Sequence, residues 1–117
     1  MSPVRWQIQC EGESLTLLRG NRARLDVAAQ TELPDAVRAR IAHQVRQDMW
    51  RLLRNLRGFS PIVQVRRVSD HLQVTAGGQI SGCFSKDHVE GMIQTLLDCP
   101  KFRARWLDYA RLPRSQK

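Results

Sequence analysis

Apolar and polar residues alternate at the start of the chain. From Val4 to Cys10 every second side chain is apolar, which is the period of a strand with one face on a core and the other in water. Turn residues follow at Gly12 and at Gly20, so we expect two further strands in an antiparallel meander. The inward positions of these two strands are Leu15, Leu17, Ala23, Leu25 and Val27.

A helical pattern then runs from Pro34 to about Arg57. Pro34 suits the first turn of a helix because its missing N–H would be unpaired there, and Asp35 complements the positive end of the helix dipole. Gly58 supplies a left-handed residue at which the helix can stop. Apolar residues recur at helical spacing in a stripe that should be buried, at Val37, Ile41, Val45, Met49, Leu52 and Leu56.

The second half of the chain repeats this order of elements. Three more strands are expected around 63–66, 72–74 and 80–84, with turns at Ser69-Asp70 and Gly77-Gly78. Ser85 is predicted to cap a second helix, and Pro100 to begin a final short helix.

The predicted fold class is α+β, in a single domain over residues 1–117. We expect an antiparallel sheet of about six strands in two three-stranded meanders, with three helices on one face, in the order βββα-βββαα. A shift of 57 residues aligns strands of the two halves, which suggests repeat units at 4–57 and 61–111 ahead of a polar tail at 112–117. The alternative is that any two meanders align this well, because alternation itself forces the apolar matches.

The composition adds a strong positive charge to this pattern. The formal net charge is +8, from 19 Lys and Arg against 11 Asp and Glu, and such a surface attracts polyanions such as nucleic acid or acidic proteins. Sixteen of the 19 cations are arginine, a bias that a high-GC genome also produces without selection for a ligand. The charge therefore favours an acidic partner without identifying it.

Features of membrane insertion and export are missing from the sequence. No stretch approaches the roughly 18 consecutive apolar residues of a membrane span, and the first ten residues form no signal-peptide core. The three cysteines are an odd number and far apart, which argues against a disulfide framework or a zinc site. We expect a cytoplasmic protein with no membrane partner, in which Cys10 is a buried, unreactive thiol.

No sequence pattern indicates catalysis, a cofactor or a metal. The histidines, His43, His71 and His88, have no metal-ligand spacing, and they are expected at the surface or at helix caps. Phosphate-binding and dinucleotide-binding glycine motifs are missing as well. We therefore predict a non-enzymatic protein with no catalytic residues, no cofactor and no metal.

The clearest candidate site is the segment from Arg38 to Arg67, which holds eight arginines and one acidic residue, Asp48. At about 100° per residue, several of these arginines lie opposite the apolar stripe, with Trp50 beside them. Guanidinium groups pair with phosphate oxygens and an indole stacks on an unpaired base. The predicted nucleic-acid-binding residues are Arg40, Arg46, Trp50, Arg51, Arg54 and Arg57.

Two alternatives remain open at this point. Trp50 is buried if the last helix or Trp6 covers it, and the arginines then form an ordinary solvated helix face. The protein could instead be a protein–protein interaction module or a homodimer that acts through a sheet edge, or a module whose basic helix docks an acidic protein.

Overall fold

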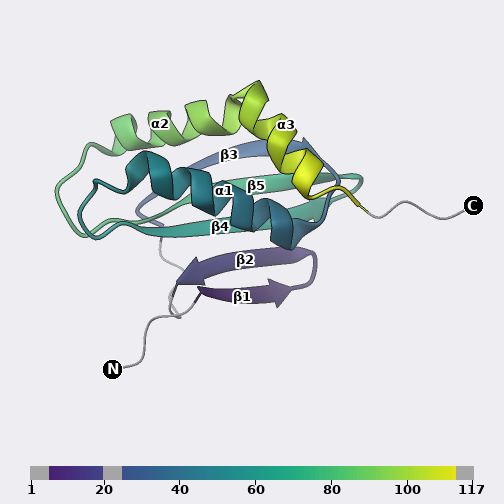
Figure 1. Cartoon of the computed structure of the whole chain (residues 1–117). Helices are drawn as coiled ribbons and strands as arrows, with labels where there is room; N and C mark the ends of the chain where they lie inside the picture. The colour runs from purple at the N-terminus through teal and green to yellow at the C-terminus, as the bar shows by residue number, and fades with distance from the viewer. Residues whose placement is uncertain (1–5, 20–24, 113–117) are drawn as a thin grey trace, which may run out of the picture.

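Five antiparallel strands form one sheet, and three helices lie over one of its faces (Figure 1). The computed structural model describes residues 6–19 and 25–112. The predicted α+β class, with an antiparallel sheet and three helices, is confirmed. The elements are β1 (Trp6–Glu11), β2 (Ser14–Arg19), β3 (Val27–Pro34), α1 (Arg38–Leu53), β4 (Ser60–Val68), β5 (His71–Gln79), α2 (Lys86–Asp98) and α3 (Pro100–Tyr109).

The strand order is β1-β2-β4-β5-β3, so the predicted pair of three-stranded meanders is wrong. β2 pairs with β4, and β3 lies at the far edge beside β5. The glycines Gly77 and Gly78, predicted as a turn, lie inside β5 opposite Ala28 and Val27. A Cβ atom at Gly77 would overlap the carbonyl oxygen of Val27, so glycine is required there by the close approach of β3 rather than by a turn.

Of the three strands expected in the second half of the chain, only two form over the described residues, because residues 80–85 form a loop. The backbone N–H of Ile80 donates to the Asp26 carboxylate at 2.9 Å, and that of Gly82 donates to the Arg57 carbonyl. These groups therefore bond to loop partners and not to a neighbouring strand. The βββα-βββαα repeat is accordingly not supported. Ser85 does cap α2, since its hydroxyl accepts from the N–H of His88.

α1 is shorter than predicted at both ends. Pro34 is the last residue of β3, and Asp35 accepts from the N–H of Ala36 in the connection to the helix. The helix ends at Leu53, and Gly58, with φ of 69°, makes its left-handed turn only after four further residues. Within the predicted buried stripe, Leu52 is exposed.

The core lies between the helices and the face of the sheet that they cover. Leu17, Val65 and Val74 point to this side, and Trp106 of α3 is fully buried among the helices. Leu18 and Ile62 pair across β2 and β4 on the opposite face, and both are buried as well.

β1 lies at the sheet edge outside the helical layer, and the prediction that it is half-buried is wrong (Figure 1). Only Trp6 is partly buried, because it reaches back towards α1, and Ile8 is 45 % exposed. Cys10, predicted as a buried thiol, is exposed. Leu25, predicted to face the core, is also exposed, whereas the predicted inward position Ala23 lies outside the described residues.

Candidate functional site

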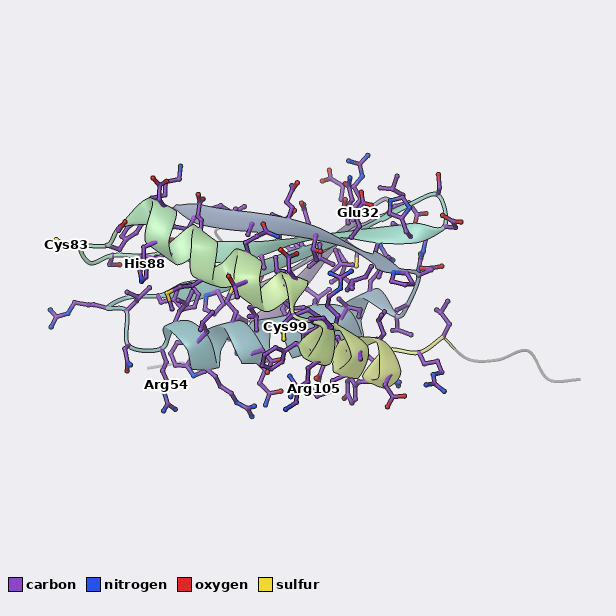
Figure 2. The ribbon with its side chains drawn as sticks, turned by 90° about the horizontal axis from the view of Figure 1, so that it is seen from above. Glu32, Arg54, Cys83, His88, Cys99 and Arg105 are labelled. Carbon is purple, nitrogen blue, oxygen red and sulfur yellow. The ribbon has the colours of Figure 1, made fainter. Side chains whose placement is uncertain are left out.

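The six predicted site residues all belong to α1 or to the turn that follows it. Three arginines and the tryptophan lie within the helix, and Arg54 caps its C-terminus. Arg46 is half-buried and the other five residues are exposed. Figure 2 shows Arg54 extending outward from the end of α1. We call the set formed by Arg40, Arg46, Trp50, Arg51, Arg54 and Arg57 the α1 arginine face.

Trp50 is accessible to solvent. Its side chain is 41 % exposed, and its indole is stacked on Phe59, with the ring centroids 6.4 Å apart and the planes 10° from parallel. Neither α3 nor Trp6 buries it. Phe59 holds the indole in place, because it is itself buried at the start of β4. One ring face is thus supported by the protein while part of the indole stays open to a ligand.

A pocket of about 190 Å³ lies between Trp6, Arg46, Trp50 and Pro61. The Arg46 guanidinium lies over the Trp6 ring, 4.6 Å from its centroid, in a cation–π contact. Among the described residues nothing hydrogen-bonds the buried Nε atom of Arg46, and partial burial lowers the pKa of this guanidinium from its ordinary value. The pocket therefore combines two indoles with one guanidinium group.

Trp6 is the member of this pocket that sequence reasoning did not assign to the site. It lies in β1, forty residues before Arg46, and the two meet because the indole reaches from the sheet edge back towards α1. Alternation along β1 predicts which side of the strand the indole occupies. It does not predict that α1 lies within reach of that position, so no signal in the sequence pairs these two residues.

The opposite flank of α1 is also basic, although an acidic residue lies beneath it. Arg40 lies over the ring of Tyr109 from α3, 5.8 Å from the centroid. Asp48 is 5 % exposed and accepts from the indole N–H of Trp106 at 2.7 Å and from Arg105. Arg51 is 3.9 Å from its other oxygen. This single carboxylate is thus shared by two arginines and an indole, which leaves an excess of positive charge.

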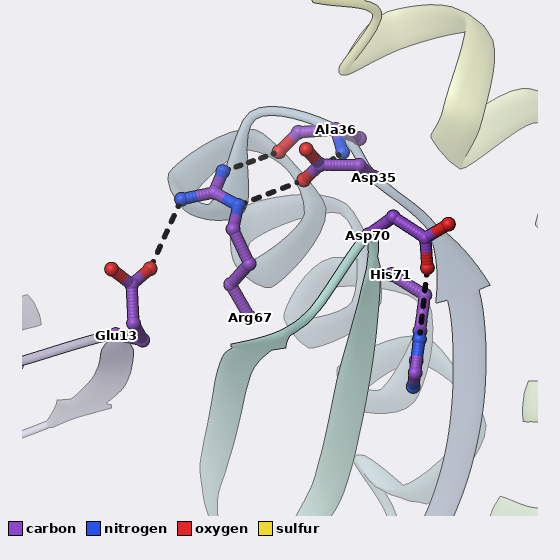
Figure 3. A network of polar contacts seen from close by, with 6 residues as sticks. All are labelled: Glu13, Asp35, Ala36, Arg67, Asp70 and His71. Atoms are coloured by element: carbon purple, nitrogen blue, oxygen red, sulfur yellow. Dashed lines mark hydrogen bonds and ion pairs between the residues drawn. The ribbon is translucent and has the colours of Figure 1, made fainter.

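Of the three remaining arginines of the segment, Arg66 and Arg67 lie outside the α1 arginine face. Arg66 is exposed on the sheet face away from the helices. Arg67 is held in ion pairs with Asp35 at 3.0 Å and with Glu13 at 3.3 Å, and it also reaches the carbonyl of Ala36 (Figure 3). The Asp35 hydrogen bond raises the pKa of the Arg67 guanidinium. Arg67 therefore ties the β1–β2 turn to the start of α1.

His43 lies on the exposed side of α1, and its imidazole can gain a proton. Burial, and secondarily the charge of Arg46, lower the pKa of its imidazole below the ordinary 6.5. It is therefore mostly neutral at pH 7 and gains a proton less readily than a histidine with the ordinary pKa. His71 lies at the β4–β5 turn, where its Nδ1 is 3.6 Å from the Asp70 carboxylate (Figure 3). Its Nε2 is 3.8 Å from the carboxylate of Glu32 in β3.

Neither a metal site nor a membrane helix is found in the part of the chain that the structure describes. No group of three or more His, Cys, Asp or Glu side chains there is placed to hold a metal ion. None of the helices over these residues is long and apolar enough to cross a bilayer. Comparison of the chain with protein-family models, with curated proteins and with solved structures returned no match in any of the three. The chemistry of the α1 arginine face is thus the basis for a functional proposal.

Proposed function

We propose that this protein is a small, basic, non-enzymatic domain that binds nucleic acid through the α1 arginine face. In this proposal the guanidinium groups contact phosphates and Trp50 stacks on an unpaired base. The distribution of acidic groups supports it: among the described residues only Arg51 of this face lies within ion-pair distance of a carboxylate, and that carboxylate, Asp48, is shared with Arg105.

The observation that carries the proposal is the exposed indole of Trp50 among these cations. Tryptophan is usually highly buried, and an exposed indole on a solvated helix face lacks the stabilisation that burial would give. The pocket beside it, lined by Trp6 and Arg46, adds a second ring and the guanidinium group that lies over it. Aromatic faces combined with cations are the composition that recognises single strands and loops.

Salt dependence of binding tests the electrostatic part. Contact with about four phosphates of a single strand gives a slope of log K against log salt of about −3, which is roughly a 50-fold loss of affinity between 50 and 200 mM salt. Fluorescence anisotropy with labelled single-stranded RNA and DNA pools measures this slope. Absence of salt-sensitive binding at 50 mM salt would overturn the proposal.

Matched charge variants locate the surface. Arg54→Gln with Arg57→Gln should reduce the slope by about 1.4, because two phosphate contacts are lost. Arg66→Gln with Arg111→Gln removes the same two charges from exposed positions outside the α1 arginine face, and its slope should match that of the wild type. Equal losses in the two double variants would mean that net charge alone attracts the ligand.

A substitution at the indole tests stacking separately. Trp50→Ala should weaken single-strand binding by about 1–3 kcal/mol, the usual contribution of a stacked base, whereas Trp50→Phe should retain most of the affinity. Duplex binding should change less in both variants, since its bases are not available to stack. Circular dichroism of each variant controls for folding, because Trp50 also packs on Phe59.

A further inference from the structure

Side chains of the helices bond to the backbone at one edge of the sheet, that of β3, and no described side chain does so at the other edge, that of β1. On β3 the edge is closed by side chains: Glu90 accepts from the N–H of Ala28 at 2.9 Å, and Gln94 donates to the carbonyl of Gln30 at 3.0 Å. Arg103 donates to a second carbonyl of the same edge, that of Glu32. No comparable contact reaches the outer edge of β1 from any described residue, so β1 presents free backbone groups.

The β1–β2 hairpin fixes which backbone groups these are. Glu11 and Ser14 flank a two-residue turn, so they form the hydrogen-bonded pair that closes it. Hydrogen-bonded pairs alternate along an antiparallel ladder. Counting back from Glu11, every second residue directs its N–H and C=O towards β2, and the residues between them, Trp6, Ile8 and Cys10, direct theirs outward.

The sequence of β1 is symmetric about Ile8. Residues 6–10 read Trp-Gln-Ile-Gln-Cys, with the same order of apolar and polar residues in both directions. An antiparallel copy centred on Ile8 therefore places apolar side chains opposite apolar ones and glutamine opposite glutamine. These residues include no proline and no charge, the devices by which proteins usually block an edge.

We propose that β1 is a homodimerisation edge, at which a second copy of this chain pairs antiparallel with Ile8 opposite Ile8. The outward groups then form six backbone hydrogen bonds: two within the Ile8 pair and two within each of the two symmetric pairs of Trp6 with Cys10. The result is one continuous sheet of ten strands. The exposed side chain of Ile8 gains an apolar partner in the second copy.

The symmetry places the two helical layers on the same side of the joined sheet, because the two-fold axis of an edge-to-edge antiparallel pair runs perpendicular to the sheet. Each copy then contributes its own α1 arginine face on either side of the β1 seam. The five paired residues span only about 17 Å, which is short for a stable interface. We therefore expect a concentration-dependent dimer with a dissociation constant on the order of 10–100 µM.

Sedimentation velocity of the full chain between 10 µM and 1 mM tests the dimer without any nucleic acid. Ile8→Pro is the diagnostic variant: the Ile8 N–H points outward, so proline removes no bond within the chain but deletes the two bonds at the centre of the seam. Ile8→Val is the matched control. Dimerisation should weaken at least tenfold in Ile8→Pro and stay near wild type in Ile8→Val, with both variants retaining the wild-type circular dichroism spectrum.

Disulfide trapping tests the register. In a background with Cys10, Cys83 and Cys99 replaced by serine, a mixture of Gln7→Cys and Gln9→Cys chains should form a covalent heterodimer. These positions face each other as a non-hydrogen-bonded pair with Cα atoms about 4.5 Å apart, within disulfide range. Chains carrying Gln7→Cys alone should cross-link far less. A wild-type monomer at 1 mM, an unchanged dimer in Ile8→Pro or equal cross-linking of the single variant would each overturn the proposal.

Discussion

Removal of the buried Asp48 carboxylate should destabilise the protein by disconnecting α3 from α1. Trp106 is fully buried, and its indole N–H donates to Asp48 at 2.7 Å. In Asp48→Ala this donor has no acceptor, which costs about 1–3 kcal/mol. Loss of the contact with Arg105 adds up to about 1 kcal/mol, because that side chain is 48 % exposed and its charge is screened by water.

These two effects sum to about 1–4 kcal/mol of unfolding free energy. For 117 residues the entropy of unfolding is about 0.25 kcal/mol/K, so the melting temperature should fall by about 4–16 °C. Asp48→Asn keeps an acceptor for the indole and loses only the charge, so its decrease should be about 2–4 °C. Differential scanning calorimetry at one fixed protein concentration measures both.

The ranking of the two variants decides the outcome. If the Asp48–Trp106 bond anchors α3, alanine must be clearly worse than asparagine. A melting temperature of Asp48→Ala within about 2 °C of wild type would refute the reasoning, since an unpaired buried indole N–H should destabilise the fold by more than that.

Four further substitutions test other parts of the fold. Gly77→Ala should destabilise by about 1–3 kcal/mol in urea unfolding because its Cβ meets the β3 backbone, whereas Gly91→Ala, in open space on α2, should stabilise by about 0.5–1 kcal/mol; the same sign for both would contradict this. Arg67→Met should lower stability by about 1 kcal/mol through its partly exposed ion pair with Asp35, less so at 1 M salt. Because the pKa of His43 is lowered in the folded protein, the unfolded chain binds a proton at a higher pH than the folded one, and the free energy of unfolding falls as the pH drops through 6.5. His43→Gln should therefore lose less unfolding free energy than the wild type between pH 7 and 5. Parallel pH profiles of the two proteins would count against this reasoning.

Much of the local structure could be predicted from the sequence. The Ser85 cap and the helix start at Pro100 depend on residues within one turn, and both are found. The exposure of Arg40 and Arg54 follows from the helical period, because a rotation of about 100° per residue places them opposite the apolar stripe. Local signals of this kind do not depend on which other elements pack against the segment.

The order of the strands and the extent to which the helices cover the sheet could not be predicted in the same way. Alternation identifies a strand and its two faces, but it does not say which strand lies next to it, so β3 was expected beside β2 and lies beside β5. The exposure of Cys10 has the same origin, because it depends on how far the helices extend over the sheet. Likewise the meeting of Trp6 with Arg46 is a product of tertiary packing.

Asp48 connects the stability of the fold to the charge of its surface. It is the only acidic residue between Arg38 and Arg67, and the helical period turns it inward, so its charge is directed to Arg105 and Trp106 beneath the helix. Asp48→Asn should therefore lower the melting temperature and yet leave nucleic-acid affinity unchanged or higher, since the α1 arginine face loses a negative neighbour. A parallel loss of affinity at a temperature where the variant is fully folded would show that the carboxylate positions the arginines and does not merely anchor α3.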